Sequence, residues 1–120
     1  MPSKTDSARI LTSVNEHATT RIVAYVPDLI DRSKVAAAAP GTRFVAAPGE
    51  LAAAAADADL VVVDVGRPGA LDAVRGIRTR TVAFARHTDA DVMAAARDAG
   101  CETVLARSQF FSRLGDWLTR

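Results

Sequence analysis

The sequence predicts one α/β domain built around a doubly wound, parallel sheet of five strands. Five short apolar runs recur along the chain, segments of helical periodicity separate them, and the connections between them are short. Runs that are apolar throughout, without alternation, are typical of strands buried on both faces. Strands that alternate with helices favour a parallel sheet with helices on both sides.

The first unit begins at residues 22–26, where the run IVAYV predicts a buried strand. Asp28 follows, and its carboxylate can cap the free amides at the start of a helix. Apolar and small residues then continue at helical spacing, at Leu29, Ile30, Ser33 and Ala37. Pro40-Gly41 ends this helix.

The second unit has a strand at residues 42–46 and an alanine-rich helix at 50–56, which follows Pro48-Gly49. Alanine has the highest helix propensity, so the near low-complexity composition still predicts a helix. The third unit has a strand at 60–64 and a helix at 68–77.

The fourth unit has a strand at 81–85 and a helix at 89–99, which Gly100 ends. The fifth has a strand at 102–106, and we expect Ser108 to cap the last helix. We expect the flavodoxin-like strand order 2-1-3-4-5. A barrel of eight such units needs about twice this length.

Composition limits the classes of protein that the chain can represent. It has 120 residues, 49% hydrophobic and 24% charged, with a formal net charge of +1. This balance favours one globular domain at residues 21–120 and argues against a general nucleic-acid binder. Residues 1–20 are polar and predict a flexible extension. Cys101 is the single cysteine, which excludes an internal disulfide and predicts a buried apolar role.

No apolar stretch reaches the ~20 residues of a transmembrane helix, and no secretory signal is evident, so we expect a cytoplasmic protein without membrane contact. We also see no cofactor motif, because glycine-rich nucleotide loops are absent. The two histidines, His17 and His87, are far apart in the sequence and do not predict a metal site. An enzyme of flavodoxin-like fold is the least favoured class.

Charged side chains follow the strands at the edge where doubly wound folds place their functional groups. Asp64 closes the third strand. Arg67, Arg86 and Arg107 follow the third, fourth and fifth strands, and with His87 they can form a positive mouth that binds a phosphate, a nucleotide or a partner's carboxylate.

Residues 21–120 resemble a receiver domain of the response regulators of bacterial two-component signalling. Asp64 with Pro68-Gly69 is similar to the phosphoacceptor segment of that family. The segment from Arg86 to Asp89, with Ala-Gly-Cys at 99–101, resembles the region after the fourth strand. The resemblance implies a phosphoacceptor at Asp64.

The supporting positions of a receiver have changed. The resemblance aligns the magnesium-binding acidic pair with Val26 and Pro27, whereas Asp28 is one position too late. It aligns the hydroxyl residue of the fourth strand with Ala85 and the lysine that contacts the phosphoryl group with Arg107. A hard dication needs oxygen ligands, so we predict a degenerate pseudo-receiver without bound metal, in which Asp64 pairs with Arg107.

The last helix carries an apolar stripe that predicts both sheet covering and an interface. The interface candidates are Phe110, Phe111, Leu114 and Trp117. Receivers pair through the face of helix four, strand five and helix five, and the resemblance implies that face here. Because the chain ends directly after this helix, we expect no attached output domain.

The favoured hypothesis is a non-enzymatic, single-domain signalling module that acts through protein–protein contact, as a homodimer or with a separate effector. Two alternatives remain open. One is a binder of a small anionic ligand or nucleotide at the carboxyl edge of the sheet. The other is a true single-domain response regulator that is phosphorylated at Asp64.

Overall fold

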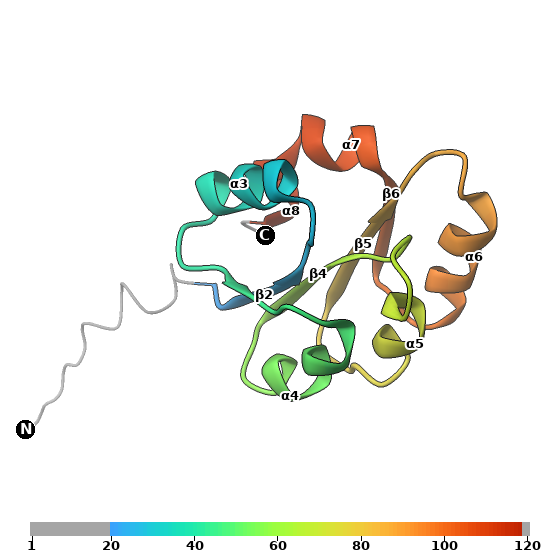
Figure 1. The fold of residues 1–120 in the computed structure, drawn as a ribbon, viewed down its shortest axis with the longest axis horizontal. Helices are drawn as coiled ribbons and strands as arrows, with labels where there is room; N and C mark the ends of the chain where they lie inside the picture. The colour runs from blue at the N-terminus through green and yellow to red at the C-terminus, as the bar shows by residue number, and fades with distance from the viewer. Residues whose placement is uncertain (1–19, 119–120) are drawn as a thin grey trace, which may run out of the picture.

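Five strands form one parallel sheet in the order β3-β2-β4-β5-β6 (Figure 1). The computed structural model describes residues 20–118, so the expected extension at residues 1–20 lies almost entirely outside the described residues. Numbered along the chain, the strand order is 2-1-3-4-5, and every pairing is parallel. The predicted fold class and strand order are confirmed.

The strands run close to their predicted bounds. They are β2 (Ile22–Tyr25), β3 (Arg43–Phe44), β4 (Leu60–Asp64), β5 (Thr81–Ala85) and β6 (Thr103–Ala106). The edge strand β3 is shorter than the expected 42–46. Its pairing continues by one bond, in which the Val45 amide donates to the Ala24 carbonyl at 2.9 Å.

The helices are shorter than their predicted spans. They are α3 (Leu29–Ala38), the 3₁₀ turn η1 (Pro48–Glu50), α4 (Leu51–Ala55), α5 (Ala70–Val74), α6 (Ala90–Asp98), α7 (Arg107–Ser112) and α8 (Leu114–Leu118). Helix α5 begins only after Gly69, because that residue has φ +81°, a left-handed conformation that favours glycine. No described helix has the length and apolar character needed to span a membrane.

The expected last helix is divided at Arg113, whose φ of −134° and ψ of 42° separate α7 from α8. The expected cap at Ser108 is wrong, because α7 begins one residue earlier, at Arg107. Gln109 instead reaches back to the helix start, where its Oε1 accepts from the Ala106 amide at 3.1 Å.

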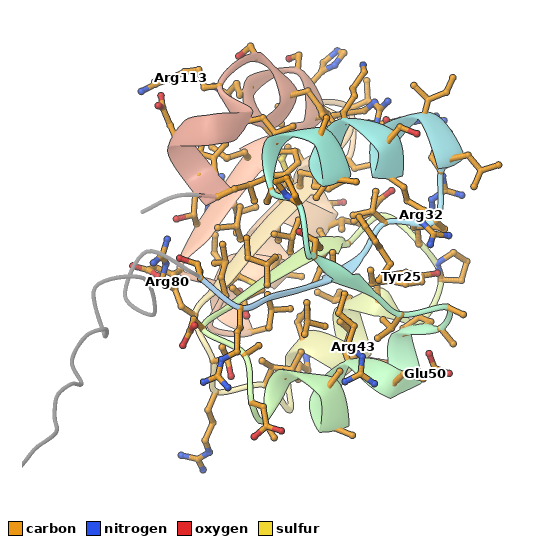
Figure 2. The ribbon with its side chains drawn as sticks, turned by 90° about the vertical axis from the view of Figure 1, so that its left-hand side faces the viewer. Tyr25, Arg32, Arg43, Glu50, Arg80 and Arg113 are labelled. Carbon is orange, nitrogen blue, oxygen red and sulfur yellow. The ribbon has the colours of Figure 1, made fainter. Side chains whose placement is uncertain are left out.

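The sheet separates two apolar cores (Figure 2). Successive strand residues point to opposite faces, so β4 gives Val61 and Val63 to one core and Leu60 and Val62 to the other. Helices α4, α5 and α6 cover the first face, whereas α3, α7 and α8 cover the second. The strand order reverses between β2 and β4, and this reversal places a site at their carboxyl ends.

Helix α3 faces the sheet with residues that the apolar pattern did not indicate. Asp31 and Val35 are buried, at 1% and 0% exposure. Leu29 and Ile30 are 73% and 68% exposed, and they are the exposed large hydrophobic residues of the described chain. The apolar residues at the start of this helix are therefore exposed, and a carboxylate occupies the inward position.

Helix α7 buries one of the four interface candidates completely. Phe110 has 0% exposure and stacks on Phe84, with ring centroids 4.6 Å apart and planes 8° apart. Phe111 meets both rings edge-on, whereas Leu114 and Trp117 pack partly buried against the same core. Phe110 is therefore a core residue, and its assignment as an interface residue is wrong.

We predict that Phe110→Ala lowers the free energy of unfolding by about 3–5 kcal/mol, because it removes a fully buried ring and leaves a cavity. Leu29→Ala serves as the control, and we expect it to change stability by less than about 0.5 kcal/mol, since Leu29 is exposed. Urea unfolding followed by circular dichroism measures both. Similar losses in the two variants would contradict this assignment of the core.

Candidate functional site

A cavity of about 510 Å³ lies at the carboxyl edge of the sheet, between the ends of β2, β4 and β5. We call it the mouth cavity. Its lining brings together residues from four segments of the chain: Asp28, Asp31, Asp64, Gly66, Arg67, Pro68, Phe84, Ala85, Arg86, Asp89 and Arg107. Four aspartates face three arginines there, so the mouth cavity is not the net positive mouth that we expected from the arginines alone.

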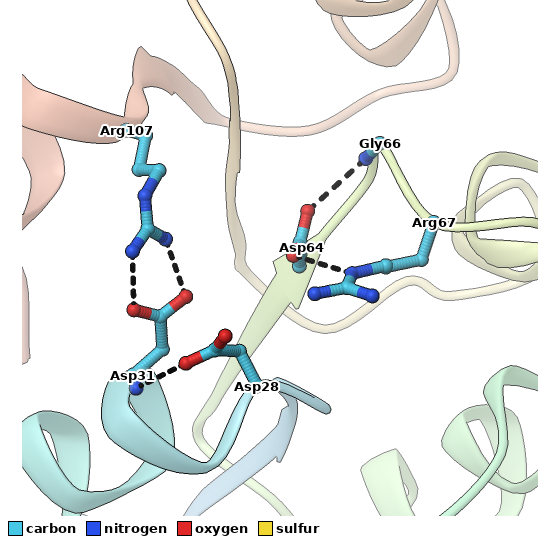
Figure 3. A network of polar contacts seen from close by, with 6 residues as sticks. All are labelled: Asp28, Asp31, Asp64, Gly66, Arg67 and Arg107. Carbon is cyan, nitrogen blue, oxygen red and sulfur yellow. Dashed lines mark hydrogen bonds and ion pairs between the residues drawn. The ribbon is translucent and has the colours of Figure 1, made fainter.

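Asp64 ends β4 with its side chain 13% exposed (Figure 3). Its Oδ1 accepts from the Gly66 amide at 3.3 Å, and its Oδ2 accepts from Arg67 Nε at 3.2 Å. Both donors belong to the loop that follows the strand. The charge of Asp64 is therefore balanced locally, three residues further along the chain.

Arg107 begins α7 and binds a different carboxylate. Its Nη1 and Nη2 donate to the two carboxylate oxygens of Asp31, a bidentate pair that joins α7 to α3 (Figure 3). The hydrogen bond to Asp31 raises the pKa of Arg107 above its ordinary value. The expected Asp64–Arg107 pair is wrong. Arg107 pairs with Asp31 instead, because the Asp31 carboxylate is buried, at 1% exposure, and needs a cation.

Asp28 caps α3, as predicted. Its Oδ1 accepts from the Asp31 amide at 3.0 Å, and this backbone hydrogen bond lowers the pKa of Asp28 below 3.8. A lowered pKa means that the carboxylate form stabilises the helix start above about pH 3.8. That contribution is lost as pH falls through the lowered pKa.

The positions that align with the metal-binding pair of a receiver supply no side-chain oxygen. Val26 is 1% exposed within the core, and Pro27 follows it at the rim. Ala85 ends β5 and is buried, so a methyl group stands where a receiver has a hydroxyl. Across residues 20–118, no group of three or more His, Cys, Asp or Glu side chains is placed to hold a metal ion.

Sequence reasoning missed two carboxylates of the mouth cavity, Asp31 and Asp89. Asp31 stands four residues before the buried Val35 on the same helical face, and this spacing is the signal that could have found it. The sequence placed Asp89 at the start of a helix and in the receiver-like segment after the fourth strand, but not among the site residues. A Cβ placed on Gly66 would lie 3.4 Å from Asp89 Oδ2 and 3.6 Å from Asp64 Oδ1, so the loop passes close to both carboxylates.

The remaining sequence candidates lie in different surroundings. Arg86 lines both the mouth cavity and a neighbouring cavity on the side of α3 and α7, whereas His87 lines the second cavity alone. Cys101 is buried, as predicted, at 9% exposure, and burial raises the pKa of its thiol. A raised pKa disfavours the thiolate, which is the nucleophilic form of a cysteine.

Comparison with solved structures identifies the fold as receiver-like. A response regulator from Thermotoga maritima is 22% identical, with a TM-score of 0.63 over 82% of this chain and 93% of its own. The phosphorylated cyanobacterial phytochrome response regulator RcpA is 17% identical, with a TM-score of 0.62 over 85% of this chain and 90% of its own. No protein-family model matches the sequence, and no curated protein matches it significantly.

The pairing of Asp31 with Arg107 leads to a stability prediction. We expect Arg107→Met to lower the free energy of unfolding by about 3 kcal/mol, because it leaves a buried carboxylate without its cation. The double variant Asp31→Leu/Arg107→Met should recover most of that loss, since it removes both charges. Urea unfolding of the two variants and the parent measures the coupling.

A loss below about 0.5 kcal/mol in the single variant, the size typical of an exposed ion pair, would contradict a structural role for this contact. Arg75→Met is the matched control. Asp72 lies in α5, and Arg75 directly follows that helix. The two pair at 2.6 Å with both side chains exposed, so Arg75→Met should lower the free energy of unfolding only slightly.

Proposed function

We propose that this protein is a pseudo-receiver, a signalling module that acts through protein–protein contact without conventional phosphotransfer to Asp64. The observation that supports the proposal best is the internal pairing of Asp64. Its carboxylate already accepts two hydrogen bonds from its own loop, one of them from the charged Arg67. A phosphoryl group would have to displace that pairing before reaching the carboxylate oxygen.

The surrounding residues also supply little support for phosphotransfer. Phosphoryl transfer is assisted by a dication that neutralises charge on the transferred group, and such a cation needs oxygen ligands. Val26 and Pro27 offer none from their side chains, and Ala85 offers no hydroxyl at the end of β5. Asp28, the nearest acid to the aligned pair, caps a helix instead.

Arg107 is the third reason. A receiver's lysine at this position contacts the phosphoryl group, as the family resemblance implies. Here the side chain is an arginine that makes two hydrogen bonds to Asp31. Moving Arg107 toward Asp64 would leave Asp31 buried without a cation, which costs several kcal/mol. The arginine is therefore better suited to holding α3 and α7 together than to following a signal at Asp64.

Partner contact is proposed through the face formed by α6, β6 and α7, which corresponds to the pairing face of receivers. Strand β6 is an edge of the sheet, and its four residues, including Val104 and Leu105, are only partly buried. Phe111, Leu114 and Trp117 are also partly buried. Apolar side chains that keep some exposure beside a sheet edge suit a homodimer or a protein effector.

The second candidate function is that of a true response regulator phosphorylated at Asp64. One observation favours it. The acceptor-equivalent carboxylate remains at the end of β4, where it lines the open mouth cavity. The two candidates give opposite results in a phosphorylation experiment.

We predict that incubation with acetyl phosphate and Mg²⁺ leaves the mass of the protein unchanged. Arg67→Ala frees Asp64 from its cation but adds no metal ligand, so it should also stay unmodified. Val26→Asp/Pro27→Asp restores the acidic pair, and Arg67→Ala in that background should permit a mass increase of one phosphoryl group. Intact-mass spectrometry measures the outcome. A separate thermal melt of each variant checks that it is folded.

A mass shift of the unaltered protein that disappears in Asp64→Asn would overturn the pseudo-receiver proposal and favour the second candidate. The Asp64→Asn variant also serves as the negative control for the restored double and triple variants. Modification that persists in Asp64→Asn would place the reaction at another residue.

For the contact surface, we predict that light scattering detects a species of two chains and that Ala94→Arg on α6 dissociates it. Ala94 is exposed on the proposed face, and a large cation there would clash with a partner copy. Ala52→Arg on α4 is the matched control, because Ala52 is an exposed helical alanine away from that face. A one-chain mass for the unaltered protein would count against the homodimer. A two-chain mass that persists in Ala94→Arg would count against this face.

A further inference from the structure

A second cavity of about 350 Å³ adjoins the mouth cavity between α3, the loop after β5 and the start of α7. We call it the basic cavity. Its lining consists of Lys34, Arg86, His87, Thr88, Arg107, Ser108 and Phe111. Among the residues that the structure describes, no carboxylate lines it. The charged side chains that line it are therefore all basic, whereas four aspartates offset the arginines of the mouth cavity.

Two of its cations are held over one aromatic ring. Lys34 Nζ lies 5.3 Å from the centroid of Phe111, and the Arg107 guanidinium carbon lies 5.0 Å from it. Contacts of this kind are attractive, and they orient both cations at the wall of the cavity. Both cations also line the basic cavity, so an anion bound there would be attracted to each of them.

Arg107 can serve this cavity without leaving Asp31. A guanidinium has five N–H donors, and the pair with Asp31 uses one from Nη1 and one from Nη2. Three donors remain for a ligand. Because Asp31 fixes the plane of the guanidinium, these donors are held in place before any ligand arrives.

Arg86 and Lys34 supply the charge that is not already matched. Both side chains are exposed, and within residues 20–118 neither makes an ion pair with a carboxylate. The ring of His87 and the hydroxyl of Thr88 add polar groups from the loop after β5, and the hydroxyl of Ser108 adds one from the first turn of α7. Donors thus approach from three separate segments of the chain.

This arrangement selects the chemistry of the ligand. A tetrahedral phosphate presents three terminal oxygens and up to two charges, so it can accept from three directions at once, whereas a carboxylate has two oxygens in one plane. The volume of the cavity is at the lower end of the range for small-molecule sites, which suits a small compound and not a dinucleotide.

We propose that the basic cavity binds the phosphate group of a small phosphorylated compound, through Lys34, Arg86 and Arg107. This inference is independent of the pseudo-receiver proposal, because it uses neither phosphorylation of Asp64 nor a protein partner. It also moves the anion site that the sequence indicated. Arg67 is excluded from it, since Arg67 pairs with Asp64 and lines the mouth cavity alone.

The test is an isothermal titration of the full chain, at low ionic strength, with inorganic phosphate, phenyl phosphate and AMP, and with phenol as the uncharged control. We expect binding of a phosphate-bearing probe, none of phenol, and weakening by added salt. Comparing the dissociation constants of inorganic phosphate and phenyl phosphate tells whether free phosphate or a phosphate ester binds more tightly. No binding of any phosphate-bearing probe at millimolar concentration would overturn the proposal.

Four variants locate the site. Arg86→Ala and Lys34→Ala should each weaken binding about tenfold or more, because each removes a charge-assisted hydrogen bond. Arg67→Ala, at the mouth cavity, and Arg78→Ala, an exposed arginine elsewhere, should leave the affinity unchanged. Loss of binding in Arg67→Ala, or its persistence in the double variant Lys34→Ala/Arg86→Ala, would contradict the site. Since the side chains of Lys34 and Arg86 are exposed, their variants should keep the parent's melting temperature.

Discussion

A carboxylate removed from water needs a cation or several hydrogen-bond donors, and this requirement shapes the carboxyl edge of the sheet. The chain meets it twice with arginine. Asp64 is matched within its own loop by Arg67, whereas Asp31 is matched across 76 positions of sequence by Arg107. The second pair joins α3 to the beginning of α7, so two helices that cover the same face of the sheet share a polar contact.

The sequence was sufficient for the sheet because its physical signal is strong there. Continuous apolar strands such as Leu60–Asp64 and Thr81–Ala85 leave few alternatives to a parallel sheet with both faces covered, and their bounds were predicted correctly. The phase of α3 was not predictable in the same way. Apolarity alone favours burial of Leu29 and Ile30, yet Asp31 is the buried residue. Its partner, Arg107, is 76 positions away and leaves no local pattern in the sequence.

The sequence predicted which residues lie at the site better than it predicted which of them pair with one another. The strand ends bring Asp64, Arg67, Arg86 and Arg107 to one edge, as topology requires. Which arginine meets which carboxylate depends on burial and on side-chain reach, and these are properties of the packed molecule. The same packing divides the arginines between a charge-balanced cavity and a basic one, a division that a count of charged residues along the chain does not contain.

The pairing of Asp64 with Arg67 has a consequence for how the domain meets its surroundings. A counter-ion on the same loop is present at a fixed effective concentration, set by three residues of chain and not by the solution. An ion taken from solution would instead fill the position according to its abundance and affinity. The positive charge beside Asp64 at the end of β4 is thus supplied by the polypeptide itself.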